Sequence, residues 1–197
     1  MAVQTDVLRC RSCGAALRMN DTECEYCGNP VVISTFNSVK NMNPLSLNKN
    51  IASYKKDLSQ DPDDVTANKA IAYCYLKLNM YDEALKFFEK AVRDNFDDSE
   101  TYFYAAVCHL HGKKAFLAMR PDINKIEEYL GAATMIEPKG IYYYFWAYIK
   151  YDYYKRKFLV TTPDYMQMLQ QAKVHGCSVF DIQQLFSILN VDNPFKG

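Results

Sequence analysis

The residues best suited to chemistry are four cysteines near the N-terminus, arranged as two Cys-x2-Cys pairs separated by ten residues. Each pair can turn back tightly enough for both thiolates to contact one ion, and the ten intervening residues return the chain to the far side of that ion. This spacing predicts one tetrahedral Zn²⁺ site. Four protein thiolates leave no coordination position for water, so the predicted zinc is structural rather than catalytic. The predicted ligands are Cys10, Cys13, Cys24 and Cys27.

Short local elements must position these sulfur atoms. Gly14 and Gly28 follow the second cysteine of each pair, and glycine allows the positive φ with which backbone N–H groups can point at the sulfurs. Val7 and Leu8 lead into the first pair and three β-branched residues, 31–33, leave the second, which favours small strands. On these features, residues 7–33 resemble the zinc-ribbon family.

Two disulfides or a redox-active Cys-x-x-Cys pair are the alternative interpretations of the same residues. The remaining cysteines, Cys74, Cys108 and Cys177, are scattered singly and no secretion signal is evident, which favours a reducing cytoplasm. No βαβ pattern surrounds either pair, although a redox centre of this kind would be expected to have one. A segment of about thirty residues also cannot bury a sufficient core, so zinc would have to contribute roughly 10 kcal/mol or more to its folding.

Beyond the cysteines the sequence divides into a linker and a helical region. We expect a zinc ribbon over residues 1–33, a linker with Asn, Ser and Pro over 34–48, and helical repeats over 49–197. Residues 65–96 contain two amphipathic runs broken at 78–80. Ala72 and Ala84 are small enough for these two helices to cross closely, while Tyr75 and Phe88 would fill the space beside the crossing.

The same pattern recurs along the chain. At a shift of 34 residues, Tyr102, Ala105, Ala106 and His109 repeat Asn68, Ile71, Ala72 and Tyr75. The arrangement resembles the tetratricopeptide repeat (TPR), a hairpin of two helices. A second hairpin with an insertion near residues 112–122, a divergent third one after Pro138, and a capping helix that begins at Ser178-x-x-Asp181 complete the stack. The resemblance implies an all-α, TPR-like helical hairpin solenoid with a small N-terminal β zinc ribbon.

In such a stack the first helix of each hairpin lines the concave surface, where a partner would bind. The residues offset from the packing face are largely apolar and aromatic, which favours a hydrophobic peptide or helix over a carboxylate-terminated peptide. The predicted partner-binding set is Thr66, Lys69, Tyr73, Lys77, Glu100, Phe103, Val107, His111, Tyr142, Phe145, Ile149 and Tyr153.

The run from Tyr142 to Tyr154 is aromatic on every face of its helix, so some face must be covered. Either the insertion near Phe116 and the terminal helix cover it within the chain, or a partner does. The cluster Lys155, Arg156 and Lys157 that follows is open to two interpretations. It could contact an acidic partner, or it could simply favour a helix C-terminus through the helix dipole.

The overall charge restricts the function. Lys and Arg together number 23, as do Asp and Glu, and this balance argues against a protein whose main task is to neutralise nucleic-acid phosphates. No apolar run is long enough to span a bilayer, so we expect no membrane insertion and a cytoplasmic location. No phosphate loop or nucleophile motif is present. The chain resembles bacterial proteins that join a zinc ribbon to TPRs, which implies a non-catalytic adaptor with a protein partner; the alternative is a nucleic-acid-associated factor that uses the ribbon.

Overall fold

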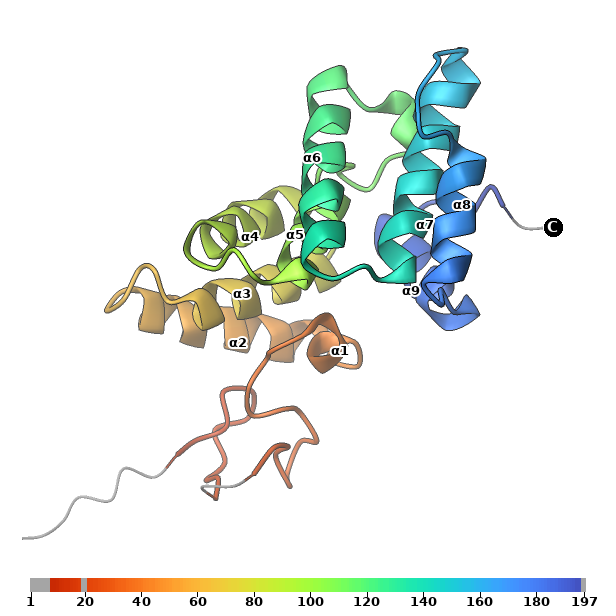
Figure 1. Ribbon diagram of the computed structural model, residues 1–197. Coiled ribbons are helices and arrows are strands. Elements are labelled where there is room, and N and C mark those ends of the chain that lie inside the picture. The colour runs from red at the N-terminus through yellow and green to blue at the C-terminus, as the bar shows by residue number, and fades with distance from the viewer. Residues whose placement is uncertain (1–7, 19–20, 196–197) are drawn as a thin grey trace, which may run out of the picture.

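The computed structural model describes residues 8–18 and 21–195, and Figure 1 shows that they form a curved stack of helices with the cysteine segment at one end. Nine α-helices and no strand are formed within these residues. The helices are α1 (Phe36–Val39), α2 (Pro44–Leu58), α3 (Val65–Lys77), α4 (Tyr81–Asp94), α5 (Ser99–Cys108), α6 (Arg120–Ile136), α7 (Gly140–Ile149), α8 (Tyr165–Val174) and α9 (Val179–Leu189). Short turns of other helix types also occur: η1 (Ala115–Leu117), and η2 (Lys150–Tyr154) with η3 (Lys155–Lys157), which continue α7.

Local sequence signals start these helices where expected. Asp64 and Asp98 accept hydrogen bonds from backbone N–H groups of α3 and α5, which satisfies donors that have no partner inside the helix. Ser178 and Asp181 form the predicted capping box at the start of α9. Each of these caps fixes where a hairpin or the closing helix begins.

Consecutive helices pack in pairs, as the repeat pattern predicts. The helices α3 and α4, α5 and α6, and α7 and α8 form three hairpins, and α2 packs against α3 as the preceding half-repeat. Ala72 and Ala84 are completely buried, and small side chains of this kind allow α3 and α4 to pack closely. Phe88 is also fully buried beside them. The helical part of the fold prediction is therefore confirmed.

The expected linker over residues 34–48 is corrected by the structure. It contains α1 and the first residues of α2, and Asn43 caps α2 with its side chain. Phe36, Val39 and Leu47 are buried in the main core. The scattered apolar residues of this segment lacked a sustained helical period because α1 is only one turn long and a turn separates it from α2.

The expected β strands of the ribbon are not formed within the described residues either. Two isolated antiparallel bridges, between Arg9 and Ala16 and between Glu23 and Pro30, take their place. Val7 lies outside the described residues, and the segment after Pro30 bends away so that Ile33 is buried against the helices. The Ile33 backbone N–H donates to the Tyr54 hydroxyl at 3.2 Å, which holds this bend.

Helices α1 and α9 occupy the concave side of the stack. The Phe36 ring of α1 lies 5.4 Å from the ring of Tyr104, and the Phe186 ring of α9 lies 5.3 Å from that of Tyr148. The Tyr81 hydroxyl also donates to the Ile188 carbonyl at 2.7 Å. The surface that would be open in a bare stack is thus largely filled by the chain itself. Among the described residues no helix is long and apolar enough to cross a membrane.

Candidate functional site

The cysteine segment is built from two turns that repeat each other with a shift of 14 residues. In the first turn, Cys10 N–H donates to Ala15 and Gly14 N–H donates to Cys10, both at 2.8 Å; the second repeats these bonds with Cys24, Asn29 and Gly28, at 2.9 and 2.8 Å. Gly14 and Gly28 have φ values of +81° and +66°, a region that glycine enters without steric cost. The predicted conformational role of the two glycines is confirmed.

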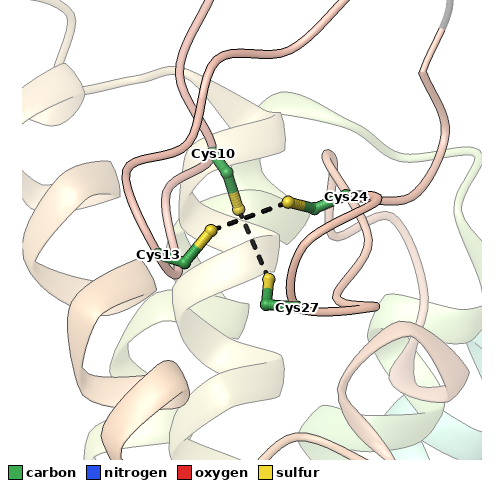
Figure 2. Close-up of side chains that lie close together, drawn as sticks. All are labelled: Cys10, Cys13, Cys24 and Cys27. Carbon is green, nitrogen blue, oxygen red and sulfur yellow. Dashed lines mark hydrogen bonds between the residues drawn. The ribbon is translucent and has the colours of Figure 1, made fainter.

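Figure 2 shows that the four cysteine side chains point toward one common centre. All four Sγ atoms lie within 4.8 Å of one another. The Sγ atoms of Cys10 and Cys27 are 3.7 Å apart, and those of Cys13 and Cys24 are 3.6 Å apart. A tetrahedron with Zn–S bonds of about 2.3 Å has edges of about 3.8 Å. The sulfur positions therefore fit a four-coordinate zinc ion. The Sγ–Sγ distances of 3.6 and 3.7 Å are also far longer than the roughly 2.05 Å of a disulfide bond.

The thiols of this cluster differ in acidity. Burial acts to raise the pKa of Cys10, but the backbone N–H groups of Cys13 and Ser12 outweigh it and lower that pKa to about 7. Burial raises the pKa of Cys27 to about 12. A cation bound by all four sulfurs must therefore displace protons, because only the thiolate form coordinates a metal.

The cysteine segment is attached to α2 by side chains of its first turn. Arg11 donates from Nη1 to Asp57 at 2.6 Å and to Ser53 at 3.0 Å, and its guanidinium lies 4.1 Å from the centre of the Tyr54 ring. Asn50 donates from its buried Nδ2 to the Ser12 hydroxyl at 2.8 Å. These contacts fix the cysteine cluster relative to the repeats. Isolated polar residues on α2 were the only sequence signal for them.

The predicted concave surface is mostly closed. Seven of the predicted partner-binding side chains are less than 9% exposed: Tyr73, Phe103, Val107, Tyr142, Phe145, Ile149 and Tyr153. Most of these side chains therefore do not face an open groove, because α1 and α9 pack over the first helices of the hairpins. Phe103 and Tyr142 still border a hollow on this side. No short-range pattern in the sequence indicates that the chain itself covers these residues.

Five residues of the predicted set remain, all with polar side chains. Thr66 is exposed, and Lys69, Lys77, Glu100 and His111 are half-buried. Lys69 forms an ion pair with Asp98 across α3 and α5, and His111 Nδ1 lies 2.5 Å from an Asp82 carboxylate oxygen. Lys77 lies beside a surface hollow that it shares with Phe180. The two paired side chains thus stabilise neighbouring hairpins, while Lys77 faces a surface that a partner can reach.

A hollow of about 280 Å³ remains open on the concave side. It is bordered by Glu100 and Phe103 of α5, Tyr142 of α7, Lys139 just before α7, and Phe180 of α9. Burial raises the pKa of Glu100, which is also close to the cation of Lys139. The hollow therefore combines aromatic and aliphatic side chains with two carboxylates, Glu100 and Asp181, and one cation, Lys139. Apolar linings with a few polar groups are common in binding sites.

Phe180 is the exposed residue of this surface that sequence reasoning missed. It is 57% exposed, Lys40 Nζ lies 4.1 Å from the centre of its ring, and a second hollow of about 360 Å³ adjoins its other side. The capping box predicts where this helix starts but does not indicate which of its apolar side chains stay exposed. The spacing of Phe180, Gln183, Gln184 and Ser187, opposite the buried Leu185 and Leu189, could have marked an outward face.

The aromatic run after residue 142 is covered within the chain. Ala115 N–H donates to the Tyr148 hydroxyl at 3.2 Å, and the Phe195 ring lies 5.7 Å from that of Tyr144 and 5.2 Å from that of Tyr151. Of the two alternatives, coverage by the insertion and the C-terminal residues is the one found. This helix needs no external partner to bury its rings.

The comparison with known families agrees with the geometry of the hairpins. A family model described as "Tetratricopeptide repeat" matches residues 51–106, which extend from α2 into α5. No curated protein matches the chain. The matched part contains TPR structure, a repeat that mediates contacts between proteins.

Proposed function

We propose that this protein is a non-catalytic cytoplasmic adaptor, in which the TPR-like stack binds a protein partner and the cysteine segment holds one structural Zn²⁺. The observation that carries the proposal is the combination of TPR hairpins with an open hollow on their concave side. The convergent sulfurs support the zinc. The described cysteines are all free, which is consistent with a reducing compartment.

The zinc in this proposal acts on folding. Cys10, Cys13, Cys24 and Cys27 would hold the ion, which would fix the two cysteine turns to each other and supply the binding free energy that replaces a core. Through Arg11 and Asn50 the folded turns then stay on α2. The resulting zinc ribbon offers a second surface for the partner complex.

The partner contact in this proposal centres on the hollow beside Phe180. Phe103 and Tyr142, two of the predicted partner-binding residues, line the hollow. Glu100, Asp181 and Lys139 add two carboxylates and one cation to its lining. An apolar anchor residue of a peptide or helix fits this composition, because aromatic floors supply most of the binding free energy at protein interfaces.

Affinity capture with the purified full chain tests this location. We expect Phe180→Asp to reduce the amount of captured partner at least tenfold, because it places a charge where an apolar side chain has to be buried. Val174→Asp is the matched control, since Val174 is 66% exposed on α8 and does not border the hollow. Equal capture by both variants would contradict the proposed site. If the wild-type chain bound nonspecific DNA with an affinity that fell as the salt concentration rose, this would instead support the nucleic-acid alternative.

A further inference from the structure

Three consecutive apolar residues project into solvent after η3. Phe158 is 96% exposed, Leu159 is 45% exposed and Val160 is 97% exposed. We call residues 158–160 the apolar tip. In Figure 1 this part of the chain lies far from the cysteine segment, at the ends of α7 and α8 that point away from it. Phe158 and Val160 bury almost no surface on folding, so packing in the core does not explain their apolar character.

The apolar tip has a defined backbone conformation. Leu159 N–H donates to the Tyr154 carbonyl at 2.9 Å, and Phe158 has φ +57° and ψ +30°. Helices usually place glycine at this left-handed position after their last turn, because a residue with a Cβ costs roughly 1 kcal/mol or more there. The chain thus holds an exposed aromatic ring in an unfavourable conformation, which is a feature found at functional sites.

A buried ion pair fixes the base of the apolar tip. Lys150 is 5% exposed, and its Nζ lies 2.5 Å from Glu127 and donates to the Thr161 hydroxyl at 2.8 Å. Trp146 and Tyr154 also donate to Glu127, so the carboxylate is fully hydrogen-bonded. The residue directly after the tip is therefore tied to the helices α6 and α7.

The chain segments next to the apolar tip carry an excess of cations, although the chain as a whole has no net charge. Segments 113–120 and 152–164 adjoin each other, because the Arg156 and Lys157 side chains lie 4.7 and 5.3 Å from the centre of the Phe116 ring. The two segments carry six cations against two carboxylates. One of the carboxylates, Asp152, is buried and bonded to Arg156, and the other, Asp164, caps α8. The six cations are Lys113, Lys114, Arg120, Lys155, Arg156 and Lys157.

Further exposed apolar side chains extend this surface. Leu117 and Met119 in the first of these segments are 66% and 71% exposed. The combination of protruding apolar side chains with surrounding cations matches the order of layers in an anionic bilayer, where acyl chains lie directly beneath negative headgroups. A protein partner would instead need a cavity shaped for the tip.

We propose that this end of the molecule docks peripherally on anionic membranes, with the apolar tip inserted at headgroup depth and the cations on the lipid headgroups. The contact is shallow and involves a loop rather than a spanning helix. It does not depend on the partner site beside Phe180. An adaptor with both surfaces would bring its protein partner to the membrane.

Vesicle co-sedimentation with the full chain tests the proposal. We expect the wild-type chain to sediment with vesicles that contain phosphatidylglycerol and phosphatidylcholine. Its partitioning should fall at least tenfold with vesicles of pure phosphatidylcholine or in 0.5 M salt. This is the order of change expected when several cation–headgroup contacts, each of about 1 kcal/mol, are removed. Phe158→Ser with Val160→Ser should also reduce partitioning at least tenfold, because each side chain contributes about 1.5 kcal/mol or more when buried. Met135→Ser, at an 88% exposed position on α6, is the matched control.

The outcomes separate this proposal from the alternatives. Charge reversal by Lys155→Glu with Lys157→Glu should abolish sedimentation, and unchanged circular dichroism would show that the fold is retained. Failure of the wild-type chain to sediment with anionic vesicles would overturn the proposal. It would also be overturned if the Phe158 and Val160 variant sedimented like wild type, or if that variant lost only the capture of a protein partner.

Discussion

The cysteine segment and the concave surface of the helical stack are both candidate sites, yet they are constructed in opposite ways. The four sulfurs come from 18 consecutive residues and converge through two turns that are alike. The concave surface is assembled from α5, α7, α9 and the start of α1, which are far apart in the chain. The difference shows that a site made by local spacing can be identified residue by residue, whereas a surface made by distant helices depends on which other elements cover it.

The largest expected effect concerns the cysteine segment. Cys10→Ser should lose the bound zinc, because one of four ligands is removed from a site that supplies roughly 10 kcal/mol of folding free energy. Metal analysis of the purified protein measures this loss, and far-UV circular dichroism should show that the helices remain. Cys177→Ser, at a cysteine outside the cluster, should retain one zinc per chain. Stoichiometric zinc in the Cys10 variant would show that the cluster is not the site.

The next prediction tests the packing of the best-formed hairpin. Ala84→Arg should unfold the helical stack or destabilise it by more than about 4 kcal/mol, because a long cation would be forced into a completely buried helix crossing. Urea denaturation measures the change. Lys86→Ala, on the exposed face of the same helix, should change the stability by less than about 0.5 kcal/mol. A midpoint that Ala84→Arg leaves unaltered would contradict the hairpin register.

A third prediction distinguishes a buried residue of the concave side from an exposed one. Phe145→Ala should cost about 3 to 5 kcal/mol of stability, because Phe145 is completely buried. Phe180→Ala should cost less than about 0.5 kcal/mol, since its ring is 57% exposed. Denaturation curves of the two variants make the comparison. If Phe145→Ala kept wild-type stability, α9 would not cover this surface in solution.

The smallest effect is expected at the ion pair between α3 and α5. Lys69→Ala should cost about 1 to 2 kcal/mol at pH 7, because it leaves the mostly buried Asp98 carboxylate without its cation. Lys77→Ala, on the same helix but in none of the ion pairs found in the described residues, should cost less. Denaturation midpoints at pH 7 measure both changes.

The same pair should make stability depend on pH. Burial acts to raise the pKa of Asp98, but hydrogen bonds from Lys69 and Thr101 outweigh it and lower that pKa below its ordinary value of 3.8. A carboxyl whose pKa is lower in the folded state stabilises the fold above its unfolded pKa, and this contribution is lost as the pH falls through the folded value. The difference between wild type and Lys69→Ala should therefore shrink below about pH 3.8. A difference that stays constant down to pH 2 would rule out this linkage.

Some features of the fold followed from short-range sequence patterns. The alternation of small and aromatic residues at Ala72, Tyr75, Ala84 and Phe88 predicted the first hairpin, and its recurrence 34 residues later predicted the second. The Ser178 and Asp181 pair predicted the start of α9. Such patterns are informative because backbone capping and helix crossing involve residues that are close in sequence.

Other features depended on contacts that no local pattern contains. Phe36 and Val39 looked like linker residues because a single helical turn has no measurable period, yet they pack into the core of the stack. The exposure of Phe103 and Phe145 could not be inferred from their helices, since it depends on where α9 folds back.

The sequence by itself determined the four cysteines that converge, the helical hairpins and their order, because each is set by residues within about 40 positions of one another. Only the tertiary structure decided that α1 and α9 close the concave side, that Phe180 stays outside, and that the apolar tip at residues 158–160 adjoins the cations of the insertion. The physical reason is that burial results from the sum of all packed neighbours, and most of those neighbours are distant in the chain.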